Sequence, residues 1–210
     1  MSGMEKRRKS RRAFWMKQLH QWHWMSSAIS LIGLLLFAVT GITLNHAADI
    51  EGSPVVRDRQ AQLPAALLAP LAPHDDADEK KPLPPPIATW IGTQLGLKAQ
   101  GMAEWSADEI YLALPRPGGD AWVSIDRTSG AVTSETTDRG WISYLNDLHK
   151  GRNAGVAWKW AIDIFAAAFL IFALTGLVLL QIHSVRRRST WPLVGLGLAL
   201  PALIAIIFIH

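Results

Sequence analysis

An uncharged apolar stretch constrains this chain more than any other feature. Residues 27–44 carry no charged side chain, and a helix of about 20 residues, rising ~1.5 Å per residue, crosses ~30 Å of hydrocarbon. His20, His23 and their neighbouring tryptophans precede the stretch, and His46 follows it. Such residues are typical of the membrane–water interface. The pattern predicts a first transmembrane helix over residues 19–46.

Two further apolar runs predict two more spans, and the charges around them predict their orientation. Residues 156–183 and 191–209 are each long enough to cross a bilayer. A basic N-terminus, residues 1–18, and a basic loop, residues 184–190, flank the spans. Because loops rich in lysine and arginine stay in the cytoplasm, we expect a multi-pass protein of the bacterial inner membrane, with a cytoplasmic N-terminus and residues 47–155 in the periplasm.

Composition excludes several classes of protein. Hydrophobic residues make up 50% of the chain and charged residues 18%, so we expect part of it in a lipid bilayer and part in water. The chain has no cysteine, which excludes disulfides, zinc–thiolate sites, iron–sulfur clusters and thiol nucleophiles. The net charge of +4 follows membrane topology rather than one binding face, and we therefore expect no nucleic acid partner.

The segment between the first two spans contains the expected soluble part. Residues 47–86 hold most of the chain's 12 prolines and an acidic run at 74–79, a composition that predicts a periplasmic linker. Residues 87–140 predict a short amphipathic helix followed by three strands, at Glu109–Leu114, Ala121–Asp126 and Ala131–Ser134. Residues 141–155 predict an interfacial helix and loop. The expected fold class is membrane α-helical, with three transmembrane helices and a small α+β domain inserted between spans 1 and 2.

A sequence motif of the first span, the repeated phrase of this chain, recurs in the second. Residues 37–44 read Phe-Ala-Val-Thr-Gly-Ile-Thr-Leu, residues 172–179 read Phe-Ala-Leu-Thr-Gly-Leu-Val-Leu, and a histidine follows each copy. Because the two helices are expected to run in opposite directions, the copies form an inverted repeat about an approximate two-fold axis in the membrane plane. Small residues on the same helices predict either close helix packing or room for a flat macrocycle.

The inverted repeat sorts five of the 7 histidines into two groups. His46 and His149 are expected at the outer face, and His183 with His20 or His23 at the cytoplasmic face. Two imidazoles that approach one iron from different helices are what a six-coordinate b-type haem requires, so each group is a candidate haem site. The alternative is that the histidines only contact lipid headgroups and the small residues only pack helices.

Two other titratable residues are weaker candidates. Asp163 lies near the outer end of the second span, where it either relays protons, holds a haem propionate through water, or is simply solvated. His74 stands in the acidic run, where a loose metal site competes with a solvated linker.

Several short motifs resemble the PepSY-associated transmembrane (PepSY-TM) family. They are Leu19-His20 ahead of Thr40-Gly41, a hairpin over Asp126–Val132, Leu148-His149-Lys150-Gly151, and Leu174-Thr175-Gly176-Leu177. Larger members of that family look like inner-membrane reductases that carry haem b and reduce ferric siderophores in the periplasm. The resemblance implies a PepSY-like domain over residues 87–140 and haem b as cofactor. It also implies these ligand candidates: His20 or His23, His46, His149 and His183.

The resemblance implies one of two functions. The first is electron transfer through haem b to a ferric siderophore or another periplasmic acceptor, which would make the protein a membrane oxidoreductase. Because this chain is short, three outcomes are open: it binds fewer haems, a homodimer or a membrane partner subunit completes the haem site, or the reductase activity is lost. The second is a non-enzymatic, membrane-anchored PepSY module that regulates a peptidase or assembles with a transporter.

Overall fold

The structure, a computed structural model, describes residues 3–50, 52–72 and 79–209. They divide into two compact units: the first is Met1–Leu36 with Ala161–His210, and the second is Phe37–Trp160. His74, the candidate for loose metal binding, lies outside the described residues.

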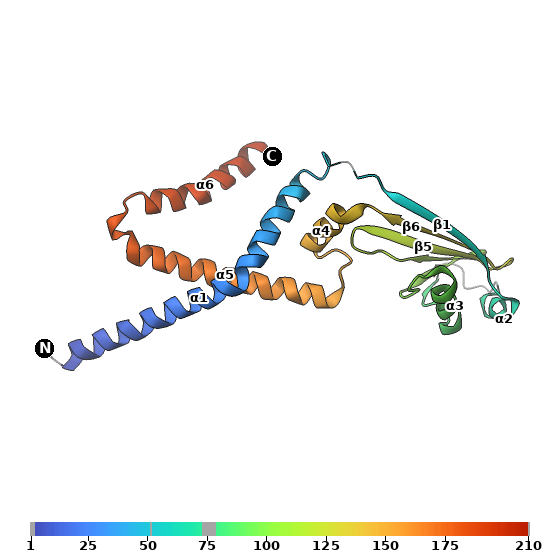
Figure 1. Cartoon of the computed structure of the whole chain (residues 1–210), viewed down its shortest axis with the longest axis horizontal. Coiled ribbons are helices and arrows are strands. Elements are labelled where there is room, and N and C mark those ends of the chain that lie inside the picture. The colour runs from blue at the N-terminus through green and yellow to red at the C-terminus, as the bar shows by residue number, and fades with distance from the viewer. Residues whose placement is uncertain (1–2, 51, 73–78, 210) are drawn as a thin grey trace. The chain divides into compact units, whose positions relative to one another are not determined.

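Three long apolar helices account for the membrane part of the chain. α1 spans Gly3–Asn45, α5 spans Gly155–His183 and α6 spans Thr190–Phe208 (Figure 1; blue, orange and red). Their most apolar windows have mean hydropathies of 2.2, 2.4 and 2.2, and each helix is long enough to cross a bilayer. The chain is therefore a multi-pass membrane protein with three candidate spans, as its sequence predicts.

α1 extends further toward the N-terminus than the predicted span. The sequence predicts a basic segment over residues 1–18 and a helix from residue 19, whereas the helix already begins at Gly3. Lysine and arginine lose little side-chain freedom in a helix and rank among the good helix formers. The basic segment can therefore continue the span as helix.

Within the first unit, α1 and α5 pack against each other in opposite directions. Three contacts show the direction: they join His20 to His183, His23 to Thr175, and Gly33 to Phe165. Positions that rise along α1 fall along α5, as in an antiparallel pair. A Cβ on Gly33 would lie 2.9 Å from the Phe165 ring, so the absence of a side chain lets that ring lie against the α1 backbone.

The second unit contains a six-stranded antiparallel sheet in the order β1-β6-β5-β4-β3-β2. The strands are β1 Val55–Gln62, β2 Glu79–Lys81, β3 Ala103–Trp105, β4 Glu109–Ala113, β5 Gly119–Asp126 and β6 Ala131–Asp138. Figure 1 shows β1, β6 and β5 side by side. The three strands predicted from alternating hydrophobicity are confirmed as β4, β5 and β6, with Leu112 opposite Val123 and Ile125 opposite Val132.

One face of this sheet carries the hydrophobic core. Side chains alternate between buried and more exposed along β4 and β5, as expected of strands with one packed face. α3 (Pro85–Leu95) contributes Ile87, Ile91 and Leu95 to the same core, and these residues recur at helical spacing. A small α+β domain therefore lies between the first and second spans, in agreement with the predicted fold class.

Residues 47–86 differ from the linker that their prolines predict. They contain the two edge strands β1 and β2 and two short helical turns, α2 (Ala65–Leu68) and η1 (Ala69–Leu71). Three of their leucines are buried in the core, namely Leu63, Leu71 and Leu83. The prolines that the structure describes here lie just outside the strands or at the starts of helices, where a missing N–H is tolerated. A high proline content is therefore compatible with folding here.

A buried arginine ties the end of η1 to the turn between β5 and β6. Arg127 is 2% exposed, and its guanidinium donates hydrogen bonds to the carbonyls of Leu71 (2.9 Å), Ala72 (2.8 Å) and Ser106. The same group lies 5.5 Å from the ring centroid of Trp105, within the range of cation–π attraction. A buried charge is unfavourable unless hydrogen bonds replace those of water, and the three carbonyls supply them.

The residue before Arg127 closes the same turn. Asp126 accepts hydrogen bonds at Oδ1 from the backbone N–H of Ser129 (2.6 Å) and of Thr128 (3.0 Å). Hydrogen bonds from the backbone and the side chain of Ser129, and then from the backbone of Thr128, lower the pKa of Asp126 below its ordinary value. They do so because they stabilise the charged form of the carboxyl group.

α4 (Gly140–Lys150) is attached to the sheet at the turn between β4 and β5. Gly118 in this turn has a φ of +72°, and a Cβ there would lie 2.8 Å from the Cα of Tyr144. Its backbone N–H donates to Asp147 Oδ2 at 2.9 Å. Only glycine allows both this backbone conformation and this close approach of the turn to α4. Gly118 therefore sets the position of α4 on the sheet.

We expect Arg127→Met to lower the free energy of unfolding by about 2–4 kcal/mol, because three carbonyls lose a buried donor. Thermal unfolding of the full chain in detergent, followed by near-UV circular dichroism, measures the change. Arg57→Met on the exposed edge strand β1 is the matched control and should leave the midpoint within a degree or so of wild type. Equal midpoints for the two variants would contradict this role of Arg127.

Candidate functional site

The copy of the repeated phrase in α5 holds a histidine of α1. The Nδ1 atom of His23 lies 2.9 Å from the hydroxyl of Thr175. The His23 ring stacks on Phe172, with centroids 4.9 Å apart and planes inclined by 17°. A Cβ on Gly176 would lie 3.4 Å from Cε1 of the same ring. Phe172, Thr175 and Gly176 thus form a cradle for one imidazole, which we call the His23 cradle.

The copy of the phrase in α1 holds a second histidine in the same way. The Nδ1 atom of His149, on α4, lies 2.7 Å from the hydroxyl of Thr40. Its ring centroid lies 4.9 Å from that of Phe37, and a Cβ on Gly41 would lie 3.6 Å from its Cε1. Phe37, Thr40 and Gly41 form the His149 cradle. Both copies of the inverted repeat therefore use the same three residue types to hold an imidazole.

The threonine of the His23 cradle determines which nitrogen of the imidazole carries the proton. The Thr175 hydroxyl donates to the carbonyls of Ile171 (2.7 Å) and Phe172 (3.0 Å) in its own helix, as helical threonines commonly do. Because its hydrogen is used there, the hydroxyl oxygen accepts from Nδ1–H of His23. In the neutral imidazole the Nε2 atom then carries the lone pair, which is the form that binds a metal ion.

The other histidines predicted as ligands have the same tautomer. Thr40 donates to the carbonyl of Phe37 at 3.3 Å, so its oxygen likewise accepts from Nδ1–H of His149. In the remaining three, Nδ1 lies within hydrogen-bond distance of the carbonyl four residues earlier: His20 with Met16 (2.8 Å), His46 with Ile42 (3.0 Å) and His183 with Leu179 (2.8 Å). A carbonyl can only accept, so Nδ1 carries the proton. Hydrogen bonds of this kind orient histidines that bind metals.

Two of these histidines are in contact across the first unit. The ring centroids of His20 on α1 and His183 on α5 lie 6.4 Å apart, and the ring planes are inclined by 89°. Two imidazoles on opposite sides of one metal ion, each about 2 Å from it, have centroids roughly 6 Å apart. The centroid spacing of this pair therefore matches that of two imidazoles bound to a single iron.

The sequence matches one described protein family over most of its length. Residues 14–210 match the family described as "Putative PepSY_TM-like". The chain belongs to the PepSY_TM-like family. The matched region includes the sheet, both cradles and the second and third spans, and it agrees with the resemblance carried by the short motifs. No curated protein and no solved structure matches the chain.

In this PepSY_TM-like protein the histidines do not pair entirely as the repeat suggests. Across residues 3–50, 52–72 and 79–209 the structure shows no ring contact between His46 and His149. His23 lies against its own cradle, and His20 is the residue in contact with His183. The structure therefore brings together one of the two expected groups.

Rings occupy the spaces beside three glycines of the spans. Gly33 faces Phe165, while Gly41 and Gly176 face the imidazoles of the two cradles. Of the two roles expected for small residues on these helices, the three glycines serve close packing rather than an open slot for a macrocycle. Asp163, the other intramembrane candidate, is exposed on α5.

Sequence reasoning missed the threonines and phenylalanines that hold the histidines. The signal is the repeat itself, because a phenylalanine, a threonine and a glycine at positions i, i+3 and i+4 share one face of a helix. The repeat does not reveal which histidine reaches that face, since each partner comes from a different helix. The His149 cradle receives its imidazole from α4, which lies outside both copies.

We expect Thr175→Val and Thr40→Val each to lower the free energy of unfolding by about 1 kcal/mol, because Nδ1–H of a histidine loses its acceptor while the side-chain shape is kept. Thermal unfolding in detergent measures the change, and Thr93→Val, an exposed threonine of α3 bonded only to its own helix, is the control. A double-mutant cycle of Thr175→Val with His23→Leu should show coupling of the same size. Additive effects would contradict the cradle.

Proposed function

We propose that this PepSY_TM-like protein is a b-type haem electron-transfer protein of the bacterial inner membrane, with His20 and His183 as the ligands of one haem iron. The contact between these two imidazoles carries the proposal. The rings come from different helices, and their centroids lie 6.4 Å apart. A bound haem b would supply one-electron transfer. His20 lies inside α1, where the predicted span begins, and His183 is the last residue of α5.

The hydrogen bonds of the pair support this assignment. The carbonyls of Met16 and Leu179 lie 2.8 Å from Nδ1 of His20 and His183, respectively. A hydrogen bond from Nδ1–H fixes the orientation of the ring and raises the basicity of Nε2. Both histidines are exposed, so a flat ligand can reach them without displacing a buried side chain.

His149 is the proposed ligand of a second haem, and His46 and His23 remain further ligand candidates. Thr40 holds the His149 imidazole with Nε2 as its basic nitrogen. Since His46 is not in ring contact with it, the other ligand is expected from a second copy of the chain or from a membrane partner subunit. The resemblance to larger family members supports a ferric siderophore as the electron acceptor in the periplasm.

Purified from haem-replete cells, the protein should show a reduced-minus-oxidised spectrum of the b type. His20→Ala and His183→Ala should each remove most of that signal, because a bound haem iron would lose one of the two histidines that hold it. Gln181→Ala, at the same end of α5, is the matched control and should keep the spectrum of wild type. Colourless wild-type protein, or full spectra in both histidine variants, would contradict the proposal.

A non-enzymatic, membrane-anchored PepSY-like module is the second candidate function. The packing of rings against Gly33, Gly41 and Gly176 favours it, because these contacts need no cofactor. In that case the His20 and His183 variants would keep the biological activity of the protein, whereas deletion of residues 87–140 would abolish it. The spectrum and the deletion together separate the two functions.

The proposed orientation has the N-terminus in the cytoplasm and the sheet in the periplasm, as the basic flanks of the spans indicate. Since the chain has no cysteine, one introduced thiol is unique. We expect Thr128→Cys to react with a membrane-impermeant maleimide in intact spheroplasts and Ser10→Cys to react only after lysis. The reverse pattern would overturn the orientation.

A further inference from the structure

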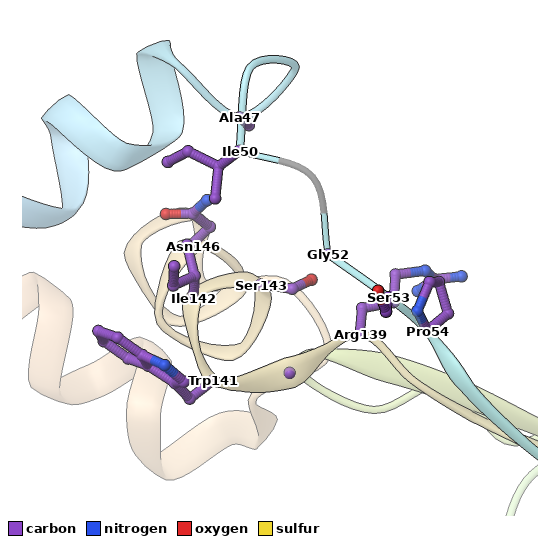
Figure 2. A pocket seen from close by; sticks show the side chains of 11 residues that line it. Ala47, Ile50, Gly52, Ser53, Pro54, Arg139, Trp141, Ile142, Ser143 and Asn146 are labelled. Carbon is purple, nitrogen blue, oxygen red and sulfur yellow. The ribbon is translucent and has the colours of Figure 1, made fainter.

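A cavity of about 380 Å³ lies in the second unit, between residues 47–50 and 52–54 and the start of α4. Figure 2 shows its lining, which we call the α4 cavity. Its volume is within the range of sites for small organic ligands. Ile50, Pro54 and Ile142 provide apolar wall, so a hydrophobic ring would lose little by leaving the bilayer for this site.

The polar side chains of the α4 cavity are suited to a ligand that accepts hydrogen bonds. Asn146 is 7% exposed, and its Oδ1 lies 2.7 Å from the hydroxyl of Thr43, which also lies 3.0 Å from the carbonyl of Thr40. The amide NH₂ carries two hydrogens, so Asn146 has a donor for a ligand with either orientation of its amide. Figure 2 shows the hydroxyl of Ser143 pointing from α4 toward Gly52 and Ser53 on the opposite wall. Both donors therefore come from α4 and lie on one side of the cavity.

The charges around the α4 cavity favour a neutral ligand. Among the described residues of the lining, Arg139 is the charged one, and its guanidinium donates to the carboxylate of Asp120 at 2.5 Å. This ion pair cancels most of the field that would attract an anion. Asp120 would compete with a phosphate or carboxylate for Arg139, whereas a carbonyl oxygen bound by Asn146 would not meet that competition.

The position of the α4 cavity in the chain favours a ligand that comes from the membrane. The lining begins at Ala47, directly after the candidate span that ends at Asn45. Trp141 at the other side of the lining is 71% exposed, and exposed tryptophans beside apolar spans commonly lie at the level of the headgroups. A ligand dissolved in the bilayer would meet the cavity at that level.

We propose that the α4 cavity binds the head ring of a membrane quinone. A quinone is neutral and flat, carries two carbonyl oxygens that accept hydrogen bonds, and partitions into the bilayer. Asn146 and Ser143 donate to those oxygens, and the apolar wall packs on the ring. This binding site goes beyond the proposed electron transfer and does not require haem.

Ubiquinone-1, a short-chain benzoquinone, is the probe for this site. Isothermal titration with the full chain in lipid nanodiscs should show saturable binding beyond partition into empty nanodiscs. Asn146→Leu, which keeps the volume but removes the amide, should weaken binding about tenfold. Ser143→Phe, which fills the cavity, should abolish it. Gln94→Phe, which adds the same ring at an exposed position of α3, should bind within twofold of wild type.

Each other outcome of this titration overturns the proposal. Wild-type protein without saturable binding, or Ser143→Phe with wild-type binding, would exclude the site. If circular dichroism shows that Ser143→Phe does not fold, Ser143→Ala, which removes only the hydroxyl, must still weaken binding about three- to tenfold. A phospholipid retained by wild-type protein and lost in Ser143→Ala, without quinone binding, would identify a lipid as the occupant. Absence of haem would leave the proposed binding intact.

Discussion

A hydrogen bond between an imidazole and a threonine, made at two places, governs how the helices of this protein meet. In a lipid environment a polar side chain needs a partner from the protein itself. Each cradle supplies that partner together with a ring and a glycine that fit the imidazole closely. Sliding α5 along α1 by one residue would leave both the imidazole and the hydroxyl of the His23 cradle without this contact. The pairing therefore fixes the register of two otherwise uniform apolar helices.

The spans and the central strands could be predicted from the sequence because each has a strong periodic or compositional signal. α1, α5 and α6 are long uncharged runs, and β4 and β5 alternate between packed and open faces. β1 gives no such signal, since it is an edge strand exposed along nearly its whole length. The buried residue Leu63 lies one position after the end of β1. Local composition therefore suggested a linker where tertiary pairing makes a strand.

The candidate site was predictable in its residue types and only partly in its pairing. Sequence symmetry identified five histidines, and the structure gives all five the same tautomer. The pairing of His20 with His183 follows from antiparallel packing of α1 and α5. The partner of His149 could not be predicted, because it depends on where Gly118 places α4. The three-residue motif on one helix determines that an imidazole can bind there. The topology of the chain determines which histidine supplies that imidazole.

The order of the sheet also limits how this protein can associate with itself. β1 and β2 are the two outer strands, and their backbone edges could in principle recruit a strand from another molecule. β1 carries Arg57, Asp58 and Arg59 in succession, and β2 consists of Glu79, Lys80 and Lys81. Rows of charge at a sheet edge oppose the addition of further strands. Self-association of this protein should therefore proceed through its apolar helices, and the soluble domain should stay free of fibrillar growth at high local concentration.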